Sequence, residues 1–176
     1  MREGGPSAVT FDAIALRVGV SKQAVIYWYR NTAQLLAAIA LSCLEAEAEA
    51  AITAAGAAND PADARRKVVQ ALTGFHLADL PRFRMMYAAP QMGANPEWAR
   101  DMLDRVHPVT ARMYQAIAGA LGDSDDEARR AQAVALHMAA LGHALLVAMT
   151  DAVGDPMRHK PEILARSLAD MLAGDG

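Results

Sequence analysis

The sequence predicts an all-α protein, with a helix-turn-helix head at its start and a larger helical body behind it. Strong helix formers, above all alanine, dominate the 176 residues, whereas β-branched residues are few. No window alternates apolar and polar residues with enough valine, isoleucine and threonine to form a strand. Helix-start and helix-stop signals recur along the chain and predict about nine helices.

The head is predicted over residues 1–42, from three local signals. Thr10 is an N-cap, and the residues after it place an apolar stripe on one helix face, with Phe11, Ile14, Ala15 and Val18. Gly19 ends this helix in the position that favours a left-handed residue. Ser21 then caps a second short helix, and Asn31 with Gln34 begins a long helix to about residue 55.

The body, residues 43–176, is predicted to contain the remaining helices. Asp60-Pro61 and Asn95-Pro96 are helix starts, because proline fits the first helical position. Pro108 is expected to kink or split the helix that runs from about 96 to 121. The other expected ranges are 61–79, 81–89, 124–152 and 162–173.

The charge distribution excludes a globally basic nucleic-acid binder, because the formal net charge is −3. Residues 1–36 nevertheless have a net charge of +2 and the remainder −5, so the head can contact a polyanion. Cys43 is the only cysteine and no signal peptide is visible, which predicts a cytoplasmic protein.

The stretch 131–150 has 20 residues without a formal charge, the length of a membrane-spanning helix. It also contains Gln132, His137 and His143, and it lacks a long run of Leu, Ile or Phe. A central core helix or a dimer-interface helix has the same appearance. We therefore predict no membrane partner.

The segment TFDAIALRVGVSKQAVIYWYRNTAQLLAAI, residues 10–39, resembles the DNA-binding segment of the TetR family of bacterial transcriptional regulators. The match rests on Ile14-Ala15, residues 19–22, the aromatic residues 27–29, Asn31 and Leu35-Leu36. Members of this family are homodimers in which the head binds operator DNA. Their all-α body binds a small molecule that changes the spacing of the two heads. The resemblance therefore implies a repressor with operator DNA and a small-molecule effector as its partners.

Three departures from the family pattern weaken the expected DNA binding. Only nine residues precede Thr10, where the family has a full helix that covers Ile14, Val18, Val20 and Val25. The family's most regular tyrosine falls at Ile26, and its lysine at the start of the next helix falls at Thr32. Either the true start lies upstream of Met1, or the head is partly decayed. The alternative function is a small-molecule-binding helical dimer whose head no longer binds DNA.

The resemblance places the helix that begins at Lys22 in the major groove. Glutamine pairs with adenine and lysine with guanine or phosphate, so Gln23 and Lys22 are the expected readers of base edges. Tyr27 and Trp28 can donate to phosphates, while Tyr29 matches a buried position of the head. The predicted DNA contacts are Thr10, Arg17, Ser21, Lys22, Gln23, Ala24, Tyr27, Trp28 and Thr32.

Methionine, aromatic and histidine residues on inward helix faces of the body predict an apolar ligand pocket. Its expected lining is Phe75, His76, Met86, Tyr87, Met102, Tyr114, His137 and Leu141. A hydrogen-bonded core histidine is the other interpretation of His76 and His137. No histidine has zinc-ligand spacing, and no phosphate loop, nucleophile elbow or paired cysteine occurs. We therefore predict no metal, no cofactor and no enzymatic activity.

Rows of small residues at a spacing of four predict close helix packing in the stretch 131–150. Together with the leucine row of the last helix, these rows predict a four-helix seam between two copies of the chain. The predicted interface residues are Ala135, Ala139, Gly142, Leu164, Leu168 and Leu172.

Overall fold

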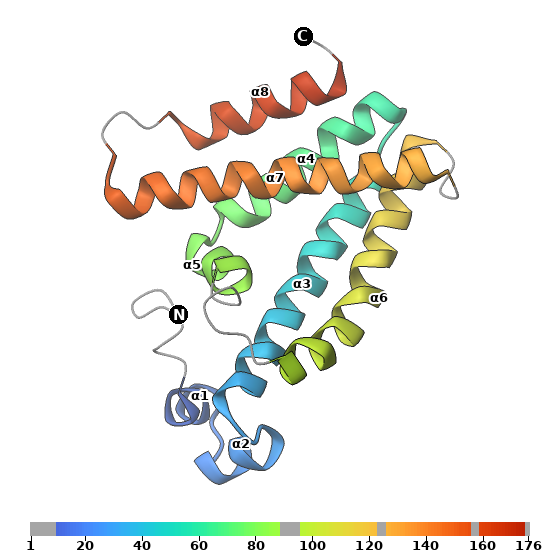
Figure 1. Cartoon of the computed structure of the whole chain (residues 1–176). Coiled ribbons are helices and arrows are strands. Elements are labelled where there is room, and N and C mark those ends of the chain that lie inside the picture. The colour runs from blue at the N-terminus through green and yellow to red at the C-terminus, as the bar shows by residue number, and fades with distance from the viewer. Residues whose placement is uncertain (1–9, 89–95, 123–125, 156–158, 175–176) are drawn as a thin grey trace. The chain divides into compact units, whose positions relative to one another are not determined.

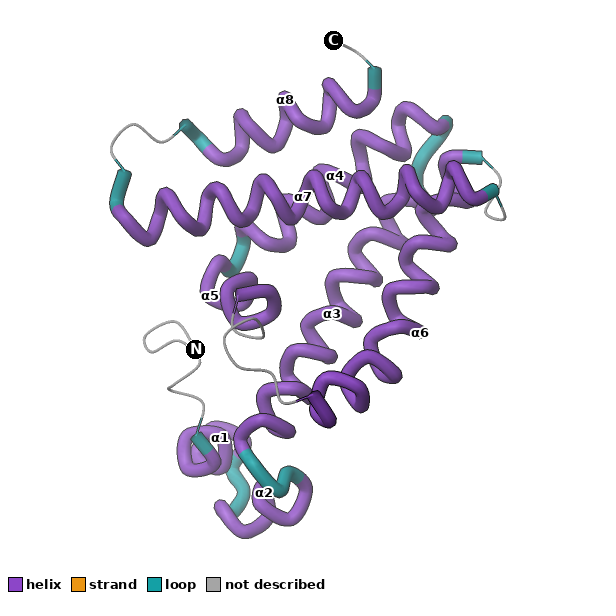
Figure 2. The backbone as a smooth tube through the Cα atoms, in the orientation of Figure 1, coloured by secondary structure: helices purple, strands orange, loops and turns teal. Residues whose placement is uncertain are grey.

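The structure is a computed structural model that describes residues 10–88, 96–122, 126–155 and 159–174, and all regular elements in these ranges are helices (Figures 1 and 2). Its elements are α1 (Phe11–Val18), α2 (Lys22–Trp28), α3 (Thr32–Gly56), α4 (Pro61–Leu77), α5 (Leu80–Phe83), the π-helical turn η2 (Arg84–Ala88), α6 (Pro96–Leu121), α7 (Glu127–Val153) and α8 (Pro161–Ala173). The predicted all-α fold with a helix-turn-helix head is confirmed.

The chain divides into two compact units, which we call the head unit and the body unit. The head unit comprises Met1–Leu44 and Pro81–Val106, and the body unit comprises Glu45–Leu80 and His107–Gly176. The first division lies close to the predicted limit at residue 42. The grouping of 81–106 with the head unit depends on contacts between distant segments, which no local signal in the sequence specifies. Helices α3 and α6 each contribute one part to both units.

The turn between α1 and α2 is built from the predicted capping residues. The Thr10 hydroxyl oxygen accepts a hydrogen bond from the Ala13 N–H at 3.2 Å. Gly19 has φ of 75°, and its N–H donates to the Ala15 carbonyl, which closes α1. The Ser21 hydroxyl oxygen accepts from the Ala24 N–H at 3.2 Å and opens α2. Each cap satisfies a backbone group that a helix end leaves without a partner.

The start of α3 is fixed by a reciprocal pair of hydrogen bonds. The Asn31 side-chain oxygen accepts from the Gln34 N–H at 2.8 Å, and the Gln34 side-chain oxygen accepts from the Arg30 N–H at 2.9 Å. This is the predicted capping box, except that Gln34 accepts from the N–H of Arg30 and not from the N–H of the N-cap residue Asn31. The box sets the point at which the chain leaves α2 and continues as the 25 residues of α3.

The core of the body unit forms where α4 lies beside α7 and α8 (Figure 1). Alanines on α3 and α7 line this core next to larger side chains of α4 and α6, and small side chains let helices approach closely. The buried cluster is Ala48, Ala51, Ala55, Ala64, Val68, Val69, Leu72, Met113, Ile117, Ala118, Leu121, Ala133, Leu136, Ala140 and Ala169.

We expected a kink or a split at Pro108, and α6 is not split there, because it continues as one helix through this residue. Proline removes one backbone N–H, so the carbonyl four residues earlier, at Asp104, loses its helical donor. Both Pro108 and Asp104 are exposed, and water can therefore hydrate that carbonyl. The expected split into two helices is wrong for this reason.

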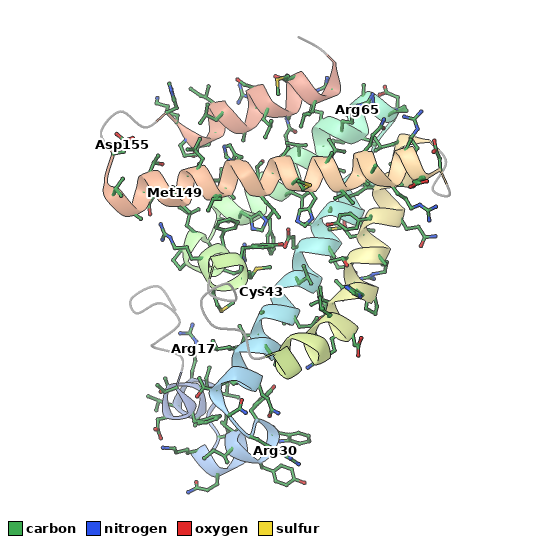
Figure 3. The ribbon with its side chains drawn as sticks, in the orientation of Figure 1. Arg17, Arg30, Cys43, Arg65, Met149 and Asp155 are labelled. Atoms are coloured by element: carbon green, nitrogen blue, oxygen red, sulfur yellow. The ribbon has the colours of Figure 1, made fainter. Side chains whose placement is uncertain are left out.

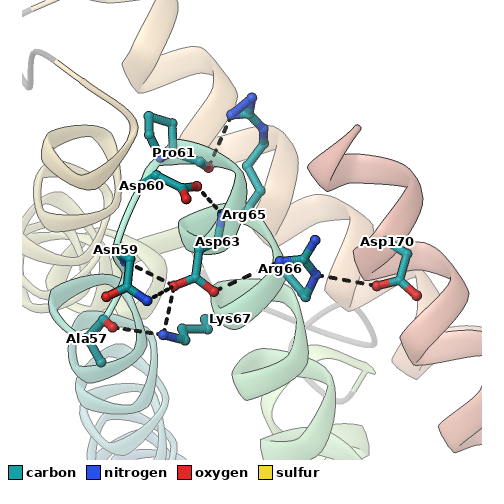
Figure 4. A network of polar contacts seen from close by, with 9 residues as sticks. All are labelled: Ala57, Asn59, Asp60, Pro61, Asp63, Arg65, Arg66, Lys67 and Asp170. Carbon is teal, nitrogen blue, oxygen red and sulfur yellow. Dashed lines mark hydrogen bonds and ion pairs between the residues drawn. The ribbon is translucent and has the colours of Figure 1, made fainter. Parts of the chain in front are cut away.

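A group of polar contacts connects the α3–α4 turn, α4 and α8 (Figure 4). Asp63 accepts hydrogen bonds from Asn59 and forms an ion pair with Lys67 at 2.8 Å. Lys67 also donates to the Ala57 carbonyl at 2.8 Å, at the end of α3. The Arg66 guanidinium lies 3.5 Å from Asp170 of α8. The hydrogen bond from Lys67 is the main reason that the pKa of Asp63 lies below its ordinary value.

Replacing Leu72 by alanine is expected to destabilise the chain strongly, because Leu72 is fully buried in the core of the body unit. The loss of its side chain should lower the free energy of unfolding by about 2–5 kcal/mol. Leu103→Ala on α6 is the matched control, because Leu103 is exposed and its loss should cost about 0.5 kcal/mol or less. Urea denaturation of the two variants at one protein concentration measures both values. Equal values would contradict the assignment of this core.

Candidate nucleic-acid interface and buried carboxylate site

The first turn of α2 presents two polar side chains to solvent, Lys22 and Gln23. The Lys22 ammonium group lies 2.8 Å from the Asp12 carboxylate of α1. Ion pairs between exposed groups are weak, about 0–1 kcal/mol, so a phosphate can replace this carboxylate. Gln23 is the next residue of the same helix, and its exposed side chain is available for contact with a base edge.

The C-terminal end of α2 exposes two neighbouring aromatic side chains. Tyr27 is 79% exposed and Trp28 is 75% exposed, and their ring centroids lie 5.4 Å apart in an edge-to-face arrangement. Large aromatic side chains in solvent are typical of binding surfaces, and both have a polar tip that can donate to a phosphate. Tyr29, the predicted core residue, is half-buried.

The other predicted DNA contacts lie on the same head. Arg17, which is labelled in Figure 3, and Thr32 are exposed, and Ala24 is half-buried. The hydroxyl oxygens of Thr10 and Ser21 serve as helix caps, which leaves their hydroxyl protons available as donors.

The four aliphatic residues that a preceding helix covers in the family differ in their exposure to solvent. Val18 and Val20 are exposed, Ile14 is half-buried and Val25 is buried. Val25 and Ala15 form the inward face of α2 and α1, and this face supports the turn that positions Lys22. Among the described residues from Thr10 to Ala40, the buried side chains are Ala15, Val25, Leu35 and Ala37.

In the body unit, the carboxylate of Glu47 on α3 is completely buried. Its Oε1 atom lies 3.0 Å from Nε2 of His76 on α4 and 2.8 Å from Nε2 of His137 on α7. An ionised carboxylate only accepts hydrogen bonds, so both imidazoles donate to it from Nε2. One oxygen atom therefore joins three helices.

Tyr114 of α6 extends this network to a fourth helix. Its hydroxyl lies 2.8 Å from Nδ1 of His137, and the two rings are 5.7 Å apart. A neutral imidazole that donates from Nε2 accepts at Nδ1, so the Tyr114 hydroxyl donates this bond. For His76 and His137, the interpretation as hydrogen-bonded core histidines agrees with these contacts.

Two opposing effects set the pKa of Glu47. Burial raises it, because the charged form loses its hydration. The hydrogen bonds from His137 and His76 favour the charged form, and they lower the pKa from 4.5 to about 2. Burial also raises the pKa of Tyr114, and the charge of Glu47 adds to this effect. Tyr114 thus retains its hydroxyl proton.

Tyr114 also lines a groove of about 520 Å³ between α6 and α7. Its other walls on α6 are Ala111 and Gln115, and those on α7 are Glu127, Arg130, Ala131 and Val134. A smaller hollow of about 300 Å³ in the head unit is lined by Tyr29, Ala38, Ile39, Ser42 and Cys43.

The remaining predicted ligand contacts are distributed over both units. Phe75 and Leu141 are half-buried in the body unit, whereas Met86 is buried and Tyr87 half-buried in the head unit. The side chain of Met102 lies outside the described residues. Among the eight predicted residues, Tyr114 is the one that lines either of these two hollows.

The outer face of α7 exposes a row of apolar side chains. Ala135 and Gly142 are exposed and Ala139 is half-buried, so three predicted interface residues lie on or beside this face. On α8, Leu164 is half-buried, and Leu168 and Leu172 pack against the chain's own core. Leu168 and Leu172 therefore serve the chain's own core. The exposed large apolar residues of the two helices are Met138, Leu145, Leu146, Met149, Val153, Ile163 and Met171.

Glu47 was not among the predicted site residues, because it lies within the run LEAEAEA, which has the composition of a solvated helix face. The position of Glu47 in the helical repeat, however, places it on the buried face of α3. Glu47 follows Leu44 by three residues and precedes Ala51 by four, and both of these residues are buried. A charged residue at an apolar position of a helix is the signal that could have identified it.

Two properties of the described residues bear on metal binding and membrane insertion. In the part of the chain that the structure describes, no group of three or more histidine, cysteine, aspartate or glutamate residues is arranged to hold a metal ion. Helix α7 is long and apolar enough to cross a membrane by length and composition alone. Core helices pass the same test, and the inward face of α7 contains buried Ala133, Leu136 and Ala140.

The geometry of α1 and α2 defines the class of the protein. A glycine-terminated helix is followed by a serine-capped helix whose first turn is exposed, and this is a helix-turn-helix of the DNA-binding type. The chain is a DNA-binding transcriptional regulator. The model of bacterial regulatory proteins of the tetR family matches residues 1–39. The predicted resemblance of the DNA-binding segment to the TetR family is confirmed over these residues.

Solved structures with the same fold cover nearly the whole chain. A bacterial regulatory protein in the tetR family from Rhodococcus RHA1 has 19% identity and a TM-score of 0.63, over 96% of this chain and 86% of that one. The TetR family transcriptional regulator PfmR from Thermus thermophilus has 19% identity and a TM-score of 0.60, with coverages of 98% and 92%. A TetR/AcrR regulator from Thermobifida fusca has 24% identity and a TM-score of 0.59, with coverages of 98% and 89%.

No curated protein aligns significantly with the sequence. At these identities the solved structures establish the fold, and the family match is confined to the head. The residues of the body unit therefore have to be interpreted from their own geometry.

Glu47→Gln is expected to reduce the loss in the free energy of unfolding that the wild type shows as the pH falls below 4.5. The pKa of Glu47 is lower in the folded state than in the unfolded chain, so the unfolded chain takes up the proton first as the pH falls. The stabilisation is complete above pH 4.5 and is lost between pH 4.5 and about pH 2. A difference of this size corresponds to about 3 kcal/mol.

The control for this prediction is Glu49→Gln on the same helix, because Glu49 is exposed and pairs with Arg112 at the surface. Its effect on the acid branch should be within about 0.5 kcal/mol. Denaturant titrations from pH 2 to pH 7 measure all three proteins. Parallel curves for the wild type and Glu47→Gln would show that Glu47 is not ionised in the folded state.

Proposed function

We propose that the chain is a ligand-responsive transcriptional repressor that binds a palindromic operator as a homodimer and is released by a small molecule. The observation that supports this function most directly is the exposed first turn of α2. Lys22 and Gln23 lie in this turn, and the Ser21 cap fixes the start of the helix. Tyr27 and Trp28 are exposed on the same helix.

The homodimer is supported by the two apolar faces of α7. Its inner face is buried in the chain's own core, whereas Met138, Leu145 and Met149 are exposed on its outer face. Together with Ala135 and Gly142, these residues alternate spacings of three and four, which is the pattern of a helix seam. An exposed apolar row of this length is typical of a protein interface. The exposed Ile163 and Met171 of α8 extend the apolar surface to the neighbouring helix.

The release by a small molecule is supported by the position of Glu47. Helix α3 begins directly after the Asn31 cap of the head and contains Glu47 in the body unit. A ligand that favours one arrangement of the body shifts the equilibrium between DNA-binding and released states by its difference in affinity for the two. A change at Glu47 acts on the same continuous helix that begins at the head.

The alternative is a small-molecule-binding helical dimer whose head does not bind DNA. The observation in its favour is Ile26, which is exposed at the position where the family has a tyrosine. Isoleucine has no group that donates to a phosphate. Operator binding separates the two functions, because the alternative predicts none.

Replacing Gln23 and Lys22 by alanine should affect operator binding in different ways. Loss of a base contact at Gln23 should cost about 1–3 kcal/mol at one base pair and relax the preference there. Loss of a phosphate contact at Lys22 should weaken binding to all sequences and lower the salt slope by about one unit. Fluorescence anisotropy with a palindromic operator at several salt concentrations measures both effects. Lys160→Ala, an exposed lysine of the body unit, is the control.

The same titrations test the proposed repressor against the alternative. Binding that does not change in either head variant, or that does not depend on salt, would contradict the assignment of α2 as the recognition helix. Absence of any operator binding by the wild type, with the dimer intact, would favour the alternative function.

Met149→Glu is expected to convert the dimer into monomers, because it introduces two unpaired charges into the seam. Each charge would be buried at a cost of several kcal/mol, and a two-fold axis doubles the effect. Multi-angle light scattering at micromolar concentration measures the molar mass. Gln132→Glu, at an exposed polar position of the same helix, should leave the dimer intact. A wild-type monomer, or an intact dimer of Met149→Glu, would refute this seam.

A further inference from the structure

The groove between α6 and α7 shares one residue with the buried carboxylate network, and this residue is Tyr114. One side of Tyr114 contributes to the groove wall. Its hydroxyl is bound to His137, which is bound in turn to Glu47. The chemistry of the groove is therefore set in part by groups that lie behind its wall.

The hydrogen-bond network determines what Tyr114 can offer to a molecule in the groove. Glu47 accepts from Nε2 of His137, so Nδ1 of the neutral imidazole accepts from the Tyr114 hydroxyl. The hydroxyl proton is committed to this bond. What remains on the Tyr114 oxygen is a lone pair, which accepts a hydrogen bond and cannot donate one.

The charge behind the wall strengthens this acceptor. Chains of hydrogen bonds polarise one another, and here the chain ends on the buried Glu47 carboxylate. At the groove itself, Glu127 and Arg130 stand three residues apart on α7 with opposite charges. These two charges offset each other, whereas the buried carboxylate lies on the far side of Tyr114. The groove therefore favours a donor with a positive charge over an acceptor with a negative one.

The remaining walls favour an apolar molecule. Ala111 of α6 and Ala131 and Val134 of α7 line the groove, and its volume of about 520 Å³ lies within the range of ligand sites. Ala131 is exposed and has a small side chain, so it leaves room in the groove for a flat or chain-like body.

We propose that this groove binds an apolar amine, with its N–H group donating to the Tyr114 oxygen and its apolar body against Ala111, Ala131 and Val134. This inference rests on the proposed function, because it assigns the chemical class of the effector. The Tyr114–His137–Glu47 chain then connects the bound amine to α3. A hydrogen bond accepted by the Tyr114 oxygen polarises its hydroxyl and strengthens the bond that it donates to His137, and His137 is one of the two donors that hold Glu47.

The test compares two probes with the same apolar body, 4-phenylbutylamine and 4-phenylbutyrate. Isothermal titration calorimetry of the full chain at pH 8 without DNA measures both. We expect the amine to bind about tenfold more tightly than the carboxylate, the ratio that one charge-assisted hydrogen bond supplies. Tyr114→Phe should bring the two affinities together. Thr150→Val, which removes a hydroxyl of helix α7 outside the groove, should leave the ratio unchanged.

A second variant tests the groove without altering the buried network. Ala131→Leu fills the groove and should weaken both probes, whereas Ala128→Leu, an exposed alanine of the same helix outside the groove, should not. Equal or tighter binding of 4-phenylbutyrate by the wild type would overturn the inference. Amine binding that survives both Tyr114→Phe and Ala131→Leu would do the same.

The calorimetric test contains no DNA, so its failure is distinct from a failure of the proposed function. Operator binding with no amine binding removes this ligand assignment and retains the repressor. Amine binding with no operator binding retains the ligand assignment and removes the repressor.

Discussion

One buried carboxylate determines how the helices of the body unit meet. Glu47 is held by two imidazole donors that come from two other helices. A buried charge is tolerated only when hydrogen bonds replace its hydration. Helices α3, α4 and α7 must therefore keep His76 and His137 in hydrogen-bonding distance of the same oxygen. Apolar packing around Leu72 and Ile117 permits many small adjustments, whereas this three-way contact permits few.

The local parts of the fold could be predicted because their causes are local. Thr10, Gly19 and Ser21 each act on backbone groups within three or four residues, and the structure has all three in the predicted roles. The course of α6 could not be predicted from Pro108 alone. The cost of a proline depends on whether water reaches the carbonyl that it leaves without a donor, and exposure is a property of the folded chain.

The buried network, in contrast, joins residues that are far apart in the sequence. The partners of Glu47 are 29 and 90 residues away in the sequence, and no local rule connects positions so far apart. Sequence reasoning identified His76, Tyr114 and His137 as a group of inward-facing residues, and three of the four members of the network were therefore named. It could not identify the carboxylate that orients them. The position of Tyr114 in a groove wall also depends on the packing of α6 against α7, which a single sequence does not specify.

The outer face of α7 and α8 has a chemical consequence of its own. Met138, Met149 and Met171 are three of its exposed apolar residues, and a thioether in solvent is readily oxidised to a sulfoxide. The sulfoxide is polar and no longer suited to an apolar contact. Pairing through this face would protect the three sulfur atoms from peroxide, while an unpaired copy would be open to attack. In a chain that pairs as proposed, oxidative damage should thus fall on newly made or separated copies, and it should prevent them from pairing afterwards.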